Sequence, residues 1–139
     1  MPLLPSYQLI HGAPSVEEYV RLRPGSGLSR RTPEQGEAAI AGSWSFRHVI
    51  GPAGDPVGMG RIVGDGGWYF VIADMAVLPE HQRCGIGGAI LDSLLEDIRS
   101  RAPEGAYVSL TADPPGRRLY ESRGFKDLGT GQDGMCRFL

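Results

Sequence analysis

The sequence predicts an α/β domain (α+β in arrangement) with elements in the order β-α-α-β-β-β-α-β-α-β. A strand-like run at 68–77 is apolar in nearly every position, which is typical of a central strand covered on both faces. A glycine-rich turn at 82–88 leads directly into a stretch with the periodicity of an amphipathic helix. With 139 residues, 41% hydrophobic and 22% charged, the chain suits one globular unit. We therefore expect residues 1–139 to form a single domain.

The first third of the chain predicts one strand and two helices. Residues 7–10 have the pattern of a short strand. A capping-box pattern at 15–18 predicts a helix that ends near Arg23, before a Pro-Gly pair. Thr32 followed by Pro33 is a favourable N-cap and first turn for a second helix.

The middle of the chain predicts three consecutive strands. Residues 44–50 and 57–63 have the pattern of strands and are separated by a turn rich in glycine and proline. A second turn at 64–67 connects them to the run at 68–77. Strands joined by such short turns favour antiparallel hairpins.

The last part predicts helices alternating with weaker strands. The helix from Gly88 to about Arg101 has its apolar side chains on one stripe: Ile90, Leu91, Leu94, Leu95 and Ile98. Residues 107–111 form the next expected strand and 115–123 a helix that ends at a glycine. One or two weak strands are expected in 126–139.

The turn from Gln82 to Gly88 is the most informative feature. A glycine-rich turn that opens a helix directs free N–H groups and the positive end of the helix dipole to one place, which suits a phosphate. A Walker A loop requires a lysine after the glycines, and none follows here. A dinucleotide fingerprint requires a third glycine, and Ile90 stands in that place.

Two motifs resemble the GNAT superfamily of N-acetyltransferases. Gln82, Gly85 and Gly87 match its acetyl-CoA motif Gln/Arg-x-x-Gly-x-Gly/Ala. Leu-Tyr-Glu-x-x-Gly-Phe at 119–125 is similar to a second motif of that superfamily. The resemblance covers roughly 57–125 and implies a mixed, mostly antiparallel central sheet flanked by helices.

The resemblance also implies the reaction and the binding residues. The expected reaction is transfer of an acetyl group from acetyl-CoA to a primary amine by direct attack, with no covalent enzyme intermediate. The strand before the turn is expected to bind pantetheine through its backbone, with the Met75 N–H facing the thioester carbonyl. The cofactor-binding residues implied in this way are Met75, Ala76, Val77, Gln82, Arg83, Cys84, Gly85, Ile86, Gly87, Gly88, Asp113 and Tyr120.

Tyr120 is the expected proton donor to the departing thiolate. It matches the tyrosine of the superfamily motif, although a semi-buried core tyrosine is the structural alternative. Asp113 stands seven residues earlier, where many relatives have an asparagine that contacts pantetheine. An ionised carboxylate cannot donate that hydrogen bond.

Asp74 is the expected general base, as the one ionisable residue in an otherwise apolar strand. A hairpin that closes at Val63 and Trp68 places it opposite Val57. A nearby arginine or backbone donor is the structural alternative, and Glu80 and His81 are other candidate bases.

Composition argues against nucleic acid, a membrane and a metal ion as binding partners. A net charge of −2 does not favour nucleic acid, and the chain has no apolar run of the ~20 residues that a membrane span needs. The first residues lack the pattern of a signal peptide, so a cytoplasmic location is the default expectation. Neither the two cysteines nor the three histidines have metal-ligand spacing.

The expected acceptor is a small-molecule amine, selected by the region from Arg21 to Trp44 and the hairpin near 64–67. Arginine pairs there suit an acidic acceptor, and Trp44, Phe46 and Trp68 suit an aromatic amine. A protein lysine or N-terminus as acceptor, and a non-catalytic CoA-binding sensor or subunit, are the alternatives. Exposed strand edges leave a homodimer open.

Overall fold

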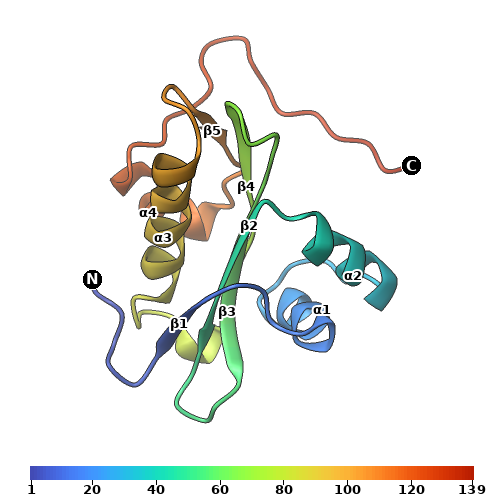
Figure 1. The fold of residues 1–139 in the computed structure, drawn as a ribbon, viewed down its shortest axis with the longest axis vertical. Coiled ribbons are helices and arrows are strands. Elements are labelled where there is room, and N and C mark those ends of the chain that lie inside the picture. The colour runs from blue at the N-terminus through green and yellow to red at the C-terminus, as the bar shows by residue number, and fades with distance from the viewer.

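The computed structural model describes residues 1–139, which form one five-stranded sheet with helices on both faces (Figure 1). α1 and α2 cover one face, and α3 and α4 lie on the other side. The strands are β1 (Gln8–His11), β2 (Ser45–Ile50), β3 (Pro56–Gly64), β4 (Tyr69–Val77) and β5 (Tyr107–Ser109). The helices are α1 (Val16–Gly25), α2 (Pro33–Gly42), α3 (Ile86–Arg101) and α4 (Arg117–Ser122), with 3-10 turns η1 (Pro79–His81) and η2 (Pro114–Gly116).

The spatial order of the strands is β1-β2-β3-β4-β5. The first four pair antiparallel, whereas β5 is parallel to β4. This parallel pairing covers only three residues of each strand, Tyr69–Val71 with Tyr107–Ser109. Beyond Val71, β4 continues to Val77 with no hydrogen-bonded strand on its β5 side, so the two strands diverge.

Two glycines let α3 approach the sheet closely. A Cβ at Gly58 would lie 2.6 Å from Ile86, and one at Gly60 would lie 2.8 Å from Ile90. Both isoleucines belong to the stripe that α3 buries in the core: Ile86, Ile90, Leu91, Leu94 and Ile98. The start of α3 is therefore held against β3 by direct packing, as interior packing density requires.

The predicted starts of α1 and α2 are confirmed, whereas α3 begins two residues before the expected Gly88 and α4 two residues after position 115. Ser15 caps α1 by accepting from the Glu18 N–H at 3.2 Å. Thr32 and Gln35 form a reciprocal capping box at α2, with Pro33 in its first turn. α1 runs two residues further than expected and includes Pro24 in its last turn.

The prediction of strands in the tail is wrong. Residues 126–139 contain no strand, so the last element of the expected order is missing. Gly129 and Gly131 have positive φ values of 124° and 81°, which interrupt an extended backbone. The tail side chains are exposed, so no buried face selects a register.

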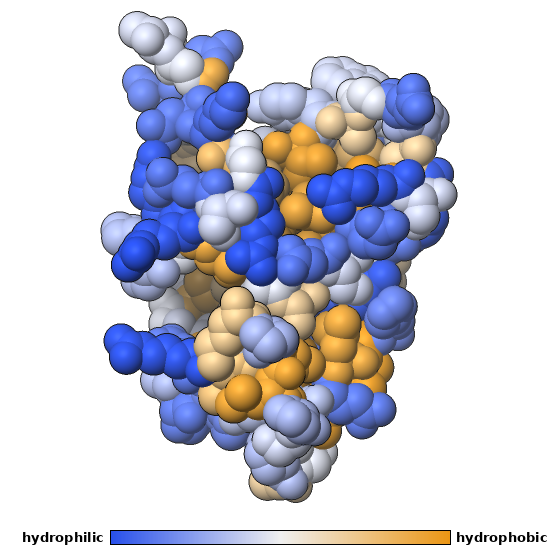
Figure 2. Space-filling view, turned by 90° about the vertical axis from the view of Figure 1, so that its left-hand side faces the viewer, coloured by the Kyte–Doolittle hydropathy of each residue, from blue (hydrophilic) through white to orange (hydrophobic).

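The surface near α3 is of mixed polarity. Figure 2 shows the side on which α3 and the N-terminus lie in Figure 1, where hydrophobic residues form patches separated by charged and polar ones. α3 is the longest helix at 16 residues, and none of the helices is long and apolar enough to cross a membrane.

Candidate active site

A β-bulge in β4 forms the centre of the site. Arg61 pairs with Ala73 and Met59 with Ala76, so Asp74 and Met75 together oppose the single residue Gly60. Asp74 has a φ of 55°, which is uncommon for a residue with a side chain. A Cβ at Gly60 would lie 2.5 Å from Met75 Sδ, so only glycine leaves room for the Met75 side chain.

The bulge corrects the predicted position of Asp74, which does not lie opposite Val57. The hairpin turn is longer than expected, because Gly64 pairs with Phe70 and Val63 with Val71. The bulge then adds one more residue to β4. Together these shifts place Asp74 beside Gly60 and Arg61.

Backbone groups of Met75 and Val77 point into the gap left by β5. The Leu78 N–H donates to the Val57 carbonyl at 2.9 Å, so Leu78 faces β3. Backbone groups alternate in direction along an extended strand, so Ala76 also faces β3 while Val77 and Met75 face away from it. That a pantetheine chain pairs with them stays a prediction.

The glycine turn presents a helix N-terminus without a side-chain cap. Gly85 is the N-cap in the left-handed region, with a φ of 81°, and no side chain bonds to the first turn of α3. The N–H groups of Ile86, Gly87 and Gly88 precede the first helical bond, from Ala89 to Gly85 at 3.1 Å. No acidic residue stands in this turn, so nothing opposes an anion there.

The preceding residues are packed against the N-terminal segment. The Leu4 N–H donates to the Cys84 carbonyl at 3.1 Å, and a Cβ at Gly85 would lie 2.3 Å from the Pro2 oxygen. Gln82 and Arg83 are exposed, and Arg83 has no ion-pair partner. The turn therefore has one fixed side and one open, positively charged side.

The structure gives neither alternative base a clear advantage. His81 Nδ1 is 2.8 Å from the Tyr7 hydroxyl, which occupies that nitrogen. Glu80 is exposed on the 3-10 turn η1.

α4, which carries Tyr120, packs against the first turn of α3. A Cβ at Gly87 would lie 3.2 Å from Leu119 Cδ2, so the first turn of α3 contacts α4 directly. Arg123 binds both oxygens of Asp92 on α3, at 2.9 and 3.0 Å. This bidentate contact fixes the orientation of α4 and therefore of Tyr120.

Tyr120 is buried but its hydroxyl has no protein partner. The residue is 9% exposed, packs against Phe125 and Gly116, and lines a cavity of about 710 Å³ between α3, β5, α4 and the tail. Burial, and then the negative charge of Asp113, raise the pKa of Tyr120 above its usual value of 10.0. The hydroxyl is therefore a neutral donor at neutral pH, while the exposed Asp113 side chain makes no hydrogen bond.

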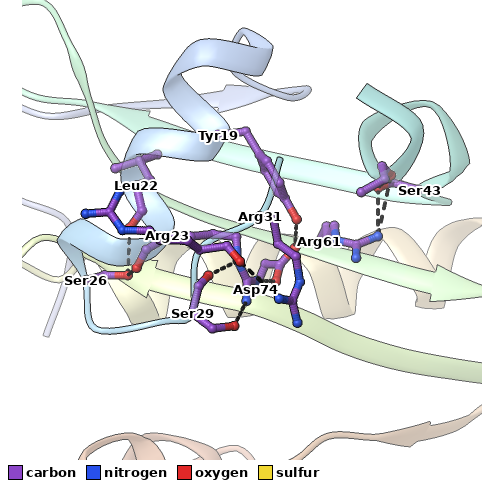
Figure 3. A network of polar contacts seen from close by, with 11 residues as sticks. Tyr19, Leu22, Arg23, Ser26, Ser29, Arg31, Ser43, Arg61 and Asp74 are labelled. Carbon is purple, nitrogen blue, oxygen red and sulfur yellow. Dashed lines mark hydrogen bonds and ion pairs between the residues drawn. The ribbon is translucent and has the colours of Figure 1, made fainter. Parts of the chain in front are cut away.

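Asp74 is fully engaged by three donors (Figure 3). Arg23 on α1 pairs with Oδ1, and Arg61 on β3 donates to Oδ2 at 2.7 Å. The Tyr19 hydroxyl donates to Oδ2 at 2.5 Å. The side chains of Asp74, Arg23 and Arg61 are only 8%, 11% and 17% exposed, so this cluster is shielded from water.

The sequence did not reveal which residues bind the Asp74 carboxylate. A nearby arginine was the structural alternative, but which arginine could not be read from the sequence. Arg61 gave one usable signal, as the only charged residue in the apolar run at 57–63. Arg23 and Tyr19 are more than 50 residues away in sequence and gave none.

No group of three or more His, Cys, Asp or Glu side chains is arranged to hold a metal ion. None of the three histidines hydrogen-bonds a serine or cysteine side chain: His48 bonds the Gly12 carbonyl and His81 bonds Tyr7. The site thus contains an open strand edge on β4, a helix N-terminus with free N–H groups and a buried tyrosine.

Known proteins share this sequence pattern and architecture. Residues 44–127 match the family model described as "Acetyltransferase (GNAT) domain". Serotonin N-acetyltransferase 2, a chloroplastic protein of Oryza sativa subsp. japonica, is 31% identical over 102 residues, which are 71% of this chain. The chain spans about half the length of that relative, 50%.

Two solved bacterial structures are similar over nearly their whole length. A Staphylococcus aureus protein of unknown function, described as a probable acetyltransferase, aligns with a TM-score of 0.89 at 32% identity, covering 96% of this chain and 99% of its own. A GNAT-family acetyltransferase of Streptococcus pneumoniae aligns with a TM-score of 0.77 at 25% identity, covering 96% and 98%. The chain therefore belongs to the GNAT family of acetyltransferases.

Proposed function

We propose that this protein transfers the acetyl group of acetyl-CoA to the primary amine of a small molecule. The observation that carries the proposal is the open side of β4, which begins beyond Val71, includes the Asp74–Met75 bulge and leads toward the glycine turn. An extended pantetheine arm fits a strand edge of this kind, since its amides pair with free backbone groups. The pyrophosphate fits the N–H groups of Ile86, Gly87 and Gly88.

The acetyl group is activated by the backbone of the bulge. The Met75 N–H faces the gap and is the donor proposed for the thioester carbonyl oxygen. Negative charge develops on this oxygen when the amine attacks, and one such donor is worth about 3 kcal/mol of transition-state stabilisation. A backbone donor on a sheet bulge is preorganised and needs no side-chain rearrangement.

The transfer is a direct displacement. The amine lone pair forms the new C–N bond, the C–S bond breaks, and the sulfur leaves with its electron pair. The Tyr120 hydroxyl donates a proton toward this sulfur. The absence of a histidine paired with a serine or cysteine supports attack by the amine itself.

Asp74, expected as the base, is better explained as a positioning residue. A proton placed on its carboxylate would lie among two guanidinium groups and a hydroxyl that already occupy both oxygens. Its pairing with α1 and β3 instead holds the strained bulge in place. We assign proton removal from the amine to water that enters with the acceptor.

A small acceptor has support from one comparison. The rice relative is named for the acetylation of serotonin, a small amine. The alternative of a non-catalytic CoA-binding protein gives no role to the Tyr120 hydroxyl, which bonds no protein group and is open to solvent, since no buried polar side-chain atom lacks a partner.

Thermal unfolding in the presence of ligands tests whether acetyl-CoA is the acetyl donor. Acetyl-CoA at about 100 times its Kd should raise the Tm by roughly 5–10 °C, while NAD and ATP at the same concentration leave it unchanged. Stabilisation by NAD alone contradicts the proposal. Thiol release measured over a panel of amines then separates an enzyme from a binding protein, which would bind acetyl-CoA without turnover.

A further inference from the structure

Three arginines surround Asp74 on the α1–α2 side of the bulge. Arg23 and Arg61 pair with its carboxylate, and Arg31 extends toward the same place from the α1–α2 loop (Figure 3). We call Arg23, Arg31 and Arg61 with Asp74 the arginine cluster. Its members come from four separate segments: α1, the loop before α2, β3 and β4.

The arginine cluster has an excess of positive charge. The sheltered Arg23 and Arg61 face one carboxylate, which leaves a formal charge of +1, and the half-buried Arg31 near them adds a second positive charge. Tyr19 adds no negative charge, because burial and its hydrogen bond to Asp74 raise the pKa of its hydroxyl above 10.0. Such an excess is costly where side chains are sheltered, unless an anion completes it.

Arg31 is the member of the arginine cluster that has no acidic partner. It takes part in no ion pair, and its recorded hydrogen bond goes to the neighbouring Arg30 carbonyl at 3.0 Å. Its other contact is the ring of Phe138 at 5.8 Å, a weak and exposed interaction. A guanidinium group has five N–H donors, so most of those on Arg31 are available.

The arginine cluster lies next to the expected reaction centre. Asp74 directly precedes Met75, whose N–H faces the gap. Arg23 also donates to the Ser29 carbonyl at 2.9 Å and thereby holds the α1–α2 loop near β4. Arg31 follows two residues after Ser29, so the same loop brings its free guanidinium to the α1–α2 side of the bulge, the side that the proposal below assigns to the acceptor.

We propose that the acceptor amine carries a compact oxyanion, a carboxylate or a phosphate, and that Arg31 binds it. This inference depends on the proposed acetyl transfer and specifies its substrate class. Arg23 and Arg61 supply the fixed positive field, while Arg31 forms the hydrogen bonds, since a guanidinium matches either oxyanion in bidentate geometry. The proton on the amine and the acetyl group move as described above, and the oxyanion takes no part in the bond changes.

Matched acceptors test the proposal. We would compare kcat/KM for primary amines that differ in one group: a carboxylate against its amide, and a phosphate ester against its alcohol. The anionic member of at least one pair should be preferred, and Arg31→Gln should reduce its kcat/KM roughly 10- to 100-fold through KM. Arg31→Lys should restore part of the loss. The pair with the larger preference identifies the kind of oxyanion.

Arg30→Gln is the matched control, since Arg30 is the exposed neighbour outside the arginine cluster. It should leave kcat/KM for both members of each pair unchanged. Equal rates for anionic and neutral amines in the wild type, or an equal loss for both in Arg31→Gln, overturn the proposal.

Binding separates this proposal from the proposed function. Calorimetry with CoA-bound protein measures the same amines without turnover, and Arg31→Gln should weaken the anionic amine alone. No thiol release with any amine contradicts acetyl transfer, even if the anionic amine binds. Turnover of neutral amines with no effect of Arg31→Gln on anionic ones contradicts only the acceptor class.

Discussion

The Leu119 side chain on α4 lies against Gly87 in the first turn of α3, where a Cβ would be 3.2 Å from Leu119 Cδ2. The expected anion site and the helix of the expected proton donor are thus in direct contact, because Tyr120 follows Leu119. A change at Gly87 therefore affects both parts of the site.

Gly87→Val should weaken acetyl-CoA binding at least tenfold. The Cβ itself is in tight contact with Leu119, and the branched methyl groups need space that either α4 or the phosphate occupies. Isothermal titration with acetyl-CoA measures the effect. Gly42→Ala is the control, since a Cβ at Gly42 would meet nothing within 4 Å. An unchanged affinity in Gly87→Val would show that the phosphate binds elsewhere.

Tyr120→Phe should reduce kcat about 100-fold with little change in acetyl-CoA affinity. The substitution removes one hydroxyl that has no protein partner, so packing against Phe125 is retained. Steady-state kinetics and the Tm of the variant distinguish lost catalysis from lost folding. A kcat equal to that of the wild type would assign Tyr120 to the core.

The pH profile of kcat tests the protonation of Tyr120. A donor must be protonated, so activity falls as pH rises through the pKa of this group, which burial and Asp113 raise above 10.0. The wild-type profile should therefore remain flat to at least pH 9. Asp113→Asn removes the negative charge and should move the alkaline limb to lower pH, whereas an unchanged limb would exclude Tyr120 as its source.

Local signals in the sequence predicted much of the fold and the turn, but not the contacts that complete the site. The capping residues at Ser15 and Thr32 act within one helical turn, and the α3 stripe depends on residues within four positions of each other. The bulge at Asp74 has no such local mark. It depends on Gly60, on the Met75 side chain and on α1, which meet only in the folded chain.

Long-range pairs explain the remaining errors. Whether Asp74 is a base or an ion-pair partner depends on Arg23, 51 residues away, and on Tyr19, 55 residues away. The prediction of one or two strands in 126–139 was wrong for the opposite reason, because the side chains there are exposed and have no distant partner against which to bury a face. Periodicity indicates which neighbouring residues share one face of a helix or strand, but it does not indicate which distant residues contact that face.

Asp74→Asn should destabilise the fold by about 3–5 kcal/mol and leave the shape of the pH profile of kcat unchanged. The substitution leaves two sheltered guanidinium groups without their counter-charge. Urea unfolding measures the loss. Asp127→Asn is the control, because the Asp127–Arg117 pair is largely exposed and should contribute nothing measurable. A fall of kcat at acid pH that is present in the wild type and lost in a folded Asp74→Asn protein would restore Asp74 as the base.

Asp97 should make the stability of the fold depend on pH in the acid range. Its side chain is partly buried, which opposes ionisation, but hydrogen bonds from Ser45 at 2.5 Å and Arg101 at 2.8 Å outweigh this and lower the pKa below 3.8. A group with a lowered folded pKa stabilises the protein at pH values above its unfolded pKa, and this contribution is lost as the pH falls through the folded pKa. The free energy of unfolding should therefore be constant near neutrality and decrease below about pH 4.

Asp97→Asn should cost about 1–3 kcal/mol at pH 7 and make the decrease below pH 4 shallower. A decrease as steep as in the wild type would assign it to Asp65 and Asp92, whose pKa values are also lowered.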